Sequence, residues 1–339
     1  MASMITDPGN LFRRTLDGLH AAGQTRQARG FRGLRGKVSF AGWMLLRTAS
    51  HSQAQGHVMG ALWRLCVWQV WKKLPHAAAI AELPNGEQLW CPPWSHLAAA
   101  WLSVGYHESE LVFARALLRK GDLVLDIGAN IGVYTVVAAR RGARVVAFEP
   151  NAKARAALQA NVALNGIAEE VQISSHALAD FIGQARFTTE LEECNHLELR
   201  SSASGDPVAV HELDSLEWIG GPVTLIKIDV EGFDEAVLRG ARQTLVRDRP
   251  VLIIETWAGG LSIREFLSPL GYVFFTYEGG TLRPLPKDFT QDANLIAIHP
   301  ENMAWVRSRL DFSKNEPLPG PRARWVVRPA RAPPPPPAR

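Results

Sequence analysis

The chain has 339 residues, of which 47% are hydrophobic and 21% charged, as is usual for globular proteins. Its formal net charge of +4 is unevenly distributed: residues 1–75 carry eleven Lys and Arg against two Asp, residues 300–339 carry eight against three acids, and residues 76–299 carry eighteen against twenty-eight. The middle of the chain is therefore acidic. This argues against a nucleic-acid-binding core, because such a surface needs concentrated positive charge.

The cysteines and the apolar runs indicate the compartment. Cys66, Cys91 and Cys194 are far apart and form no Cys-x-x-Cys pattern, which favours a reducing environment. We find no secretory signal pattern and no run of about 18 apolar residues. The sequence therefore predicts a cytoplasmic protein that is at most peripheral at a membrane.

Two segments precede the first clear α/β pattern. Residues 1–55 are rich in Gly, Arg, Gln, Ser and Ala and predict a basic, disordered arm. Val58–Leu74 carries Trp63, Trp68 and Trp71 with little polar surface, so it predicts a helix. Two interpretations stay open for this helix: an apolar brace against the rest of the protein, or an interfacial helix on a membrane surface beside the basic arm.

A hairpin and a second helix come next. Residues 78–92 contain two short strand-like runs around Pro84-Asn85-Gly86, and Asn-Gly is a strong hairpin signal. Residues 98–120 follow a helical pattern that ends before a Gly-Asp turn. We therefore interpret residues 56–120 as an N-terminal extension made of the Trp-rich helix, a β-hairpin and a lead-in helix.

The chain is organised around LVLDIGANIGVYT, residues 123–135, which predicts a strand (Leu123–Ile127), a glycine-rich turn and a helix (Val133–Arg140). In an open α/β sheet, ligands bind at the carboxyl end of such a strand. A dinucleotide site requires G-x-G-x-x-G, whereas this turn has G-x-N-x-G, with Asp126 two residues before the first glycine. A carboxylate there repels a pyrophosphate but suits an ammonium group. S-adenosylmethionine has an ammonium group and no phosphate.

After this unit, strands and helices alternate, which predicts a mostly parallel sheet with crossover helices. We expect strands at Arg144–Phe148, Val171–Ser174, Gly183–Thr188, Val208–His211, Leu225–Val230 and Val251–Ile254, and helices at Ala152–Leu164, Asp234–Leu245 and Ser262–Leu267. Two last runs, Tyr272–Tyr277 and Asn294–His299, predict an antiparallel pair that closes the sheet. Residues 301–339 predict a basic, proline-rich tail outside the core.

Seven short motifs follow one another in this region: GDLVLDIGANIGVYT (121–135), VVAFEPN (145–151), N-x-x-x-N-G (161–166), HALAD (176–180), HELDSL (211–216), LIKIDVEGFDEAVLRGA (225–241) and PVLIIE (250–255). Their order and spacing resemble the FkbM family of S-adenosylmethionine-dependent methyltransferases. The resemblance implies a class I methyltransferase domain over residues 121–300, with a Rossmann-like, mostly parallel seven-stranded sheet and a terminal antiparallel hairpin. It also implies methyl transfer to oxygen, usually to a hydroxyl of a glycan or natural product.

Five residues of the first two motifs are candidates for binding S-adenosylmethionine. Asp126 is expected to contact the methionine ammonium, directly or through water, or else to brace the loop. Gly128, Asn130 and Gly132 bring the backbone against the ligand. Glu149, at the carboxyl end of the second strand, is expected to accept hydrogen bonds from the ribose hydroxyls.

The chemistry is expected at Lys227, Asp229 and Glu231, which alternate along the end of a buried strand and so share one face. Charges at such a place are paired or functional. In the functional interpretation, one of the two acids is the base that accepts the proton of the substrate hydroxyl, and Lys227 holds the acids in register. Asp229 is the first candidate for the base and Glu231 the second. A purely structural ion pair is the alternative.

The remaining candidates are weaker. Asp180 follows the third strand, where the family places the adenine amino group, although a solvated turn acid is also consistent with the sequence. The histidines show no metal-ligand spacing, so we expect no metal. The expected acceptor is a glycan or another small molecule, not a nucleic acid, with weak membrane-surface contact through residues 1–75 as an option. The alternative functions are a scaffold or membrane-docking module without activity and an NAD-dependent oxidoreductase.

Overall fold

The structure is a computed structural model that describes residues 58–71, 73, 79–83, 85–95, 109–187, 197–198, 205–217, 220–230, 232–256, 260–278, 280–286, 289, 293–310 and 328–329. The chain forms two compact units, Met1–Trp71 with Ala99–Tyr106, and Lys72–Ala98 with His107–Arg339. The predicted arm at residues 1–55 lies outside the described residues.

The described element of the first unit is α3 (Val58–Trp71), which matches the predicted Trp-rich helix as far as Trp71. Within the ranges given above, no helix is long and apolar enough to cross a membrane. Membrane contact through residues 1–75 stays a prediction.

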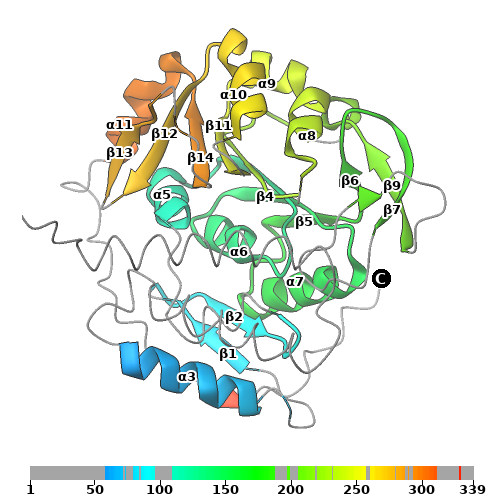
Figure 1. Ribbon diagram of the computed structural model, residues 1–339, viewed down its shortest axis with the longest axis vertical. Helices are drawn as coiled ribbons and strands as arrows, with labels where there is room; N and C mark the ends of the chain where they lie inside the picture. Colours follow the sequence, from blue (N-terminus) through cyan, green and yellow to red (C-terminus); the bar gives the residue numbers. More distant parts are fainter. Residues whose placement is uncertain are drawn as a thin grey trace, which may run out of the picture. The chain divides into compact units, whose positions relative to one another are not determined.

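The second unit is built on an eight-stranded sheet of order β13-β12-β14-β11-β10-β3-β4-β5 (Figure 1). Its strands are β3 (Leu123–Ile127), β4 (Arg144–Phe148), β5 (Val171–Ser174), β10 (Leu225–Ile228), β11 (Val251–Thr256), β12 (Val273–Glu278), β13 (Thr281–Pro284) and β14 (Ala293–Ile298). The five strands from β5 to β11 run parallel, and β14 lies antiparallel between β11 and β12. This confirms the parallel sheet and its closing antiparallel pair. The sheet has one strand more than expected, because β13 extends β12 into a hairpin.

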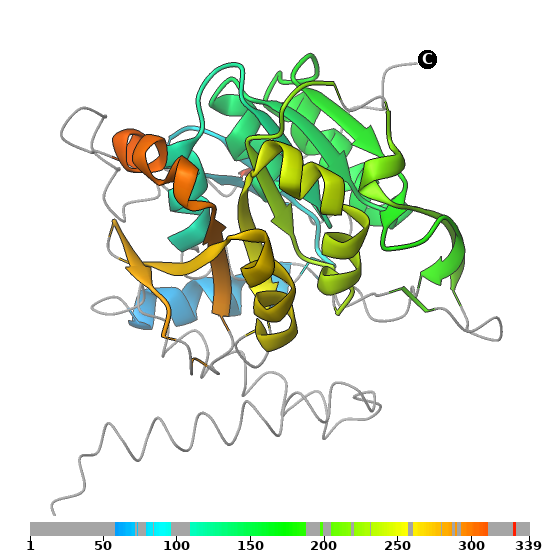
Figure 2. The same ribbon diagram turned by 90° about the horizontal axis from the view of Figure 1, so that it is seen from above.

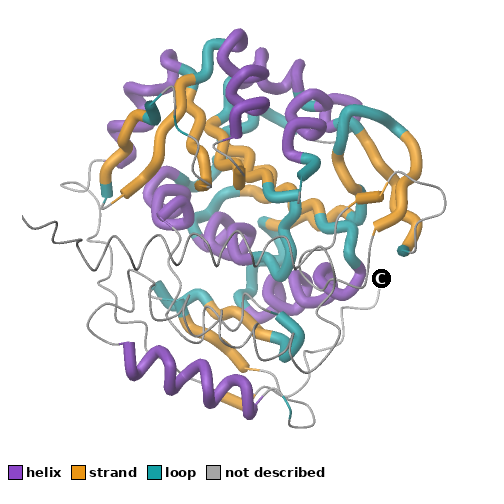
Figure 3. Tube along the Cα trace, in the orientation of Figure 1, coloured by secondary structure: helices purple, strands orange, loops and turns teal. Residues whose placement is uncertain are grey.

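Helices cover both faces of this sheet (Figure 3). One layer contains α5 (Ser109–Leu117), α6 (Val133–Arg140) and α7 (Ala152–Leu164), and the other contains α8 (Asp234–Gly240), α9 (Arg242–Asp248) and α10 (Leu261–Leu267). Leu123, Leu125 and Ile127 share a core cluster with residues of the second layer. Because strand side chains alternate, Asp126 points to the opposite face, where α6 lies. The fold thereby places this acid under the first helix.

Two smaller sheets complete the unit. A four-stranded sheet of order β6-β9-β7-β8 lies beside the main sheet (Figure 2) and contains β6 (Ala177–Leu178), β7 (Gly183–Phe187), β8 (Leu197–Glu198) and β9 (Asp206–His211). The predicted N-terminal hairpin is confirmed as β1 (Ala79–Glu82) and β2 (Gln88–Cys91). A short strand near the C-terminus, β15 (Arg328–Pro329), pairs with β1.

The single helix predicted over Asp234–Leu245 is wrong, because the chain makes two helices there. Gly240, the last residue of α8, packs closely against the segment after β6, and a Cβ at this position would lie 2.1 Å from the carbonyl oxygen of Ala179. Asp214 then caps α9: its carboxylate accepts hydrogen bonds from the backbone N–H of Gln243 and Thr244, at 2.6 and 2.9 Å. A side chain distant in sequence therefore restarts the helix.

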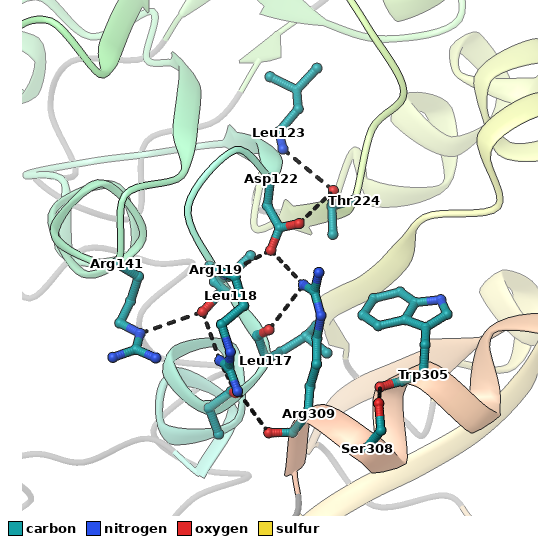
Figure 4. Close-up of polar contacts among 11 residues, drawn as sticks. Leu117, Leu118, Arg119, Asp122, Leu123, Arg141, Thr224, Trp305, Ser308 and Arg309 are labelled. Atoms are coloured by element: carbon teal, nitrogen blue, oxygen red, sulfur yellow. Dashed lines mark hydrogen bonds and ion pairs between the residues drawn. The ribbon is translucent and has the colours of Figure 1, made fainter. Parts of the chain in front are cut away.

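The predicted tail at residues 301–339 also requires correction, since α11 (Met303–Leu310) packs on the second unit. Arg309 donates to Asp122 at 2.5 Å and to the Leu117 carbonyl at 3.2 Å, and the Arg309 carbonyl accepts from Arg119 at 2.9 Å (Figure 4). These contacts join α11 to the turn that precedes β3. The folded domain therefore continues beyond residue 300.

Candidate functional site

The glycine-rich loop between β3 and α6 is shaped by three left-handed residues, Gly128, Asn130 and Gly132, with φ angles of 76°, 52° and 89°. A Cβ on Gly128 would lie 1.8 Å from the Asp229 carbonyl oxygen, and one on Gly132 would lie 2.3 Å from Leu158 Cδ1. The backbone angle requires both glycines, and at Gly128 the clash with the Asp229 backbone adds a steric requirement. The loop is held between the residue that follows β10 and helix α7.

Hydrogen bonds from β4 fix the loop on its other side. The backbone N–H groups of Gly128 and Ala129 both donate to the Phe148 carbonyl at 3.0 Å. Asn130 N–H donates to Glu149 Oε2 at 2.7 Å, and the buried Asn130 Oδ1 has no hydrogen-bond partner among the described residues. An unused acceptor at the tip of a rigid loop is a feature that a ligand donor satisfies.

Glu149 lies directly after β4 and is buried. Its Oε1 accepts from Asn151 N–H at 2.8 Å, while Oε2 accepts from Asn130. Burial raises the pKa of Glu149 to about 7, and the two backbone hydrogen bonds oppose that shift. The carboxylate keeps lone pairs for further donors, because each oxygen accepts more than one hydrogen bond.

Asp126 is fully buried on β3. Its Oδ2 accepts from the Thr135 hydroxyl of α6 at 2.6 Å, and its Oδ1 lies 3.9 Å from Lys227 Nζ without a hydrogen bond from any described residue. Burial raises the pKa of Asp126 although Lys227 and Thr135 oppose the shift. Oδ2 of Asp126 thus braces helix α6, and Oδ1 is left for a ligand donor. The two interpretations of Asp126, as a ligand-binding residue and as a brace for the loop, are therefore compatible.

Lys227, on β10, joins three groups at the carboxyl ends of the strands. Its Nζ donates to Asp229 Oδ2 at 3.0 Å and to the Gly128 carbonyl at 3.1 Å, and faces Asp126 at 3.9 Å. The ammonium also lies 5.4 Å from the centre of the Tyr134 ring. The expected pairing of Lys227 with Asp229 is present, although β10 ends at Ile228 and Asp229 follows it.

Asp229 lies beside a second acid. Ile228 pairs with Ile254 in the parallel register, so the next residues, Asp229 and Glu255, are neighbours. Burial disfavours the charged form of Asp229, but the charge of Lys227 and hydrogen bonds with the Glu255 and Lys227 side chains outweigh it and lower its pKa. The lowered pKa keeps Asp229 in its charged form next to Lys227.

The structure does not bring Asp180 into this cluster, and it does not describe Glu231. Asp180 is exposed after β6, at the end of the small sheet rather than of the main one. Glu231 lies outside the described residues. Their roles stay predictions.

Several residues that the sequence did not single out support the site. Thr135 fixes Asp126, and the buried Asp234 accepts from Val230 N–H at 3.3 Å, which shapes the loop after β10. The spacing of an acid, a glycine loop and a hydroxyl in the next helix was a usable signal for Thr135. Within the described part of the chain, no three His, Cys, Asp or Glu side chains form a group able to hold a metal ion.

Comparisons with known proteins agree with this geometry. The family model for the Methyltransferase FkbM domain matches residues 126–274. The tRNA (guanine(37)-N(1))-methyltransferase of Anopheles gambiae is 37% identical over 78 residues, 23% of this chain and 14% of that protein. The ribosomal protein L11 methyltransferase of Bacillus pumilus is 29% identical over 126 residues, 33% of this chain and 40% of that protein. The chain thus spans less than half the length of these two relatives.

A crystal structure of methyltransferase FkbM from Methylobacillus flagellatus KT aligns with a TM-score of 0.40 and 14% identity, over 78% of this chain and 60% of that one. The strand order itself defines the class. From β5 to β12 it is the doubly wound order with one antiparallel strand, β14, inserted before the last strand, and the glycine loop lies at the carboxyl end of the central strand. This is the class I methyltransferase fold.

The matched residues narrow this class further: residues 126–274 match the Methyltransferase FkbM domain, a family of S-adenosylmethionine-dependent methyltransferases. The site residues fit that cofactor on two observations. Asp126 Oδ1 and Asn130 Oδ1 are buried acceptors without a hydrogen-bond donor among the described residues, and Gly128 keeps the loop backbone free of side-chain bulk.

Proposed function

We propose that the protein methylates a hydroxyl group of a glycan or a related small natural product. The observation that carries this proposal is the cluster of Lys227, Asp229 and Glu255 beside the glycine loop. It supplies an ionised carboxylate at the end of the sheet where class I enzymes bind their ligands. An oxygen nucleophile needs such a group, because a hydroxyl must lose its proton as it is methylated.

The cofactor-binding residues have separate tasks in this proposal. Asp126 receives the methionine ammonium, and Glu149 receives the ribose hydroxyls. Gly128, Asn130 and Gly132 form the loop that the ligand contacts, and Asp180 is assigned to the adenine amino group. When bound, S-adenosylmethionine supplies a methyl group on a positively charged sulfur. Loss of the methyl group converts this sulfur to a neutral thioether.

Asp229 is the proposed proton acceptor. Its lowered pKa keeps it ionised at neutral pH, so that it orients the acceptor hydroxyl by a hydrogen bond and takes the proton as the new bond forms. Lys227 holds this carboxylate and the Gly128 carbonyl together, which ties the base to the cofactor loop. Glu231 remains the second candidate for the base.

The test is an activity assay with a panel of acceptors that differ in the attacking atom. The protein is incubated with methyl-labelled S-adenosylmethionine and simple sugars, glycans, amines, thiols and a transfer RNA, and the labelled product is identified by mass spectrometry and NMR. We expect an O-methyl ether on a hydroxylated acceptor. A methylated amine, thiol or nucleobase as the main product would refute O-methylation, and failure to bind S-adenosylhomocysteine would favour the inactive scaffold.

A further inference from the structure

Helix α7 and the residue that caps its C-terminus present two asparagines, Asn161 and Asn165, to the backbone of strand β2. Asn165 Oδ1 accepts from Gln88 N–H at 2.9 Å, and its Nδ2 donates to the Gln88 carbonyl at 2.6 Å. Asn161 repeats the pattern two strand residues further on: Oδ1 accepts from Trp90 N–H at 2.5 Å and Nδ2 lies 3.4 Å from the Trp90 carbonyl. Each carboxamide thus replaces one residue of a neighbouring strand.

The geometry of helix and strand explains this match. Four residues of an α-helix rise about 6 Å, and two residues of a strand advance about 6.6 Å. Two side chains four residues apart along the helix can therefore meet two residues that are two apart along β2: Asn161 meets Trp90, and Asn165 meets Gln88. Among the described residues, the strand order β15-β1-β2 leaves this edge of β2 without a strand partner, so the asparagines supply its hydrogen bonds.

Asn161 and Asn165 differ in the second acceptor of the side-chain amide, which for Asn165 is the Asn161 carbonyl of the same helix, at 2.8 Å. For Asn161, Nδ2 also donates to the Ile131 carbonyl at 2.8 Å, inside the glycine-rich loop, between Asn130 and Gly132. Asn161 and Ile131 are both fully buried. The two amide hydrogens of Asn161 therefore serve the loop and the hairpin, and its oxygen holds the hairpin N–H.

We infer that Asn161 is a positioning residue that couples the β1–β2 hairpin to the cofactor loop. The hairpin lies outside the matched family domain at residues 126–274. Because it binds the side-chain amide of Asn161, it nevertheless fixes the orientation in which that amide donates to the Ile131 carbonyl. Displacement of the hairpin turns the amide away from the loop, and order imposed on the loop by a ligand stabilises the hairpin. Such coupling between two places is reciprocal by thermodynamic necessity.

The first experiment compares matched variants, and it rests on the proposed cofactor site. Asn161→Asp and Asn165→Asp each keep the acceptor oxygen for β2 and lose the donor to a β2 carbonyl. Each also loses a second bond, which in Asn161→Asp is the one to the Ile131 carbonyl of the loop and in Asn165→Asp the one to the Asn161 carbonyl. We expect the affinity for S-adenosylhomocysteine, measured by calorimetry, to fall about tenfold in Asn161→Asp. We expect a change of less than about twofold in Asn165→Asp, although both variants melt earlier. Equal losses of affinity, or none, would overturn the coupling.

The second experiment needs no variant and covers the case in which Asn161→Asp does not fold. Hydrogen exchange of the wild-type chain is followed at the amides of residues 88–90 with and without S-adenosylhomocysteine. The ligand is expected to slow exchange in this hairpin segment, and unchanged exchange despite measured binding would refute the inference. Absence of binding to the wild-type chain would instead contradict the proposed function, so the two failures are distinguishable.

Discussion

At the scale of single residues, the site depends on charges that the fold removes from water in different ways. Asp126 and Glu149 are both buried and both have raised pKa values, because burial outweighs their hydrogen bonds. Asp229 has a lowered pKa because Lys227 is in direct contact with it. Three acids with the same chemistry are therefore adjusted to different roles by their partners.

The assignment of Asp229 predicts a separation of binding from turnover. Asn in place of Asp229 keeps the size of the side chain and removes the proton acceptor. We expect Asp229→Asn to retain S-adenosylhomocysteine affinity within about threefold and to lower kcat by about two orders of magnitude. Steady-state kinetics with calorimetry checks this, with Asp248→Asn as a control acid distant from the cluster. An unchanged kcat would remove Asp229 from the base role.

The pKa of Glu149 predicts a pH dependence of cofactor binding. A ribose hydroxyl donates to the ionised carboxylate, so binding favours deprotonation and the affinity should fall about tenfold per unit as pH drops below about 7. The stability of the ligand-free protein depends on pH in the opposite direction. Because the folded pKa is raised from 4.5 to about 7, the contribution of Glu149 is fully present below pH 4.5 and is lost as pH rises through about 7.

Calorimetry of S-adenosylhomocysteine binding between pH 6 and 8 measures this dependence. Glu149→Gln should bind more weakly at pH 8 and lose most of the pH dependence. A wild-type affinity that stays constant across this range would show that Glu149 does not change its protonation on binding.

At the scale of elements, the glycine loop is held by what surrounds it. Gly128 contacts the residue after β10, Gly132 contacts α7, and Ile131 is held by Asn161. The loop therefore has its binding shape because three separate elements pack against it, and a substitution that adds volume must displace one of them.

This packing predicts different results for two glycines that share a left-handed backbone. Gly128→Ala adds a Cβ that would lie 1.8 Å from the Asp229 carbonyl, whereas Gly86→Ala, in the hairpin turn, meets nothing within 4 Å. We expect Gly86→Ala to cost about 1 kcal/mol of stability. Gly128→Ala should cost several times more and abolish S-adenosylhomocysteine binding. Thermal melting and calorimetry check both, and similar effects of the two substitutions would contradict the steric argument.

At the scale of the whole molecule, helix α11 packs on the second unit at the end of the sheet opposite the site. Arg309 bridges the start of β3, where Asp122 lies, and the end of α5 (Figure 4). Arg309→Ala should lower the free energy of unfolding by about 1–2 kcal/mol through loss of these bonds. The affinity for S-adenosylhomocysteine should be unchanged. Denaturant unfolding tests this against Arg307→Ala, an exposed neighbour on α11, and a large loss of affinity in Arg309→Ala would contradict the separation.

The boundaries of β3, β4, β5 and α7 could be predicted from the sequence because periodic apolar runs between glycine and proline signals depend on local physics. The family, the cofactor loop and the Lys227–Asp229 pair were also available from residue order. The break between α8 and α9 was not, because Asp214 and Ala179, which cause it, are distant in sequence.

By itself, then, the sequence determined the class I fold, the resemblance to the FkbM family and the acids from which the proposed site is built, since these follow from the order of short local motifs. The tertiary structure alone decided how those acids are used. The raised pKa of Glu149, the contact of Asp229 with Glu255, the second hydrogen bond of Asn161 and the packing of α11 all join residues that are far apart along the chain. Desolvation and long-range hydrogen bonds depend on which elements meet, and no local pattern encodes that.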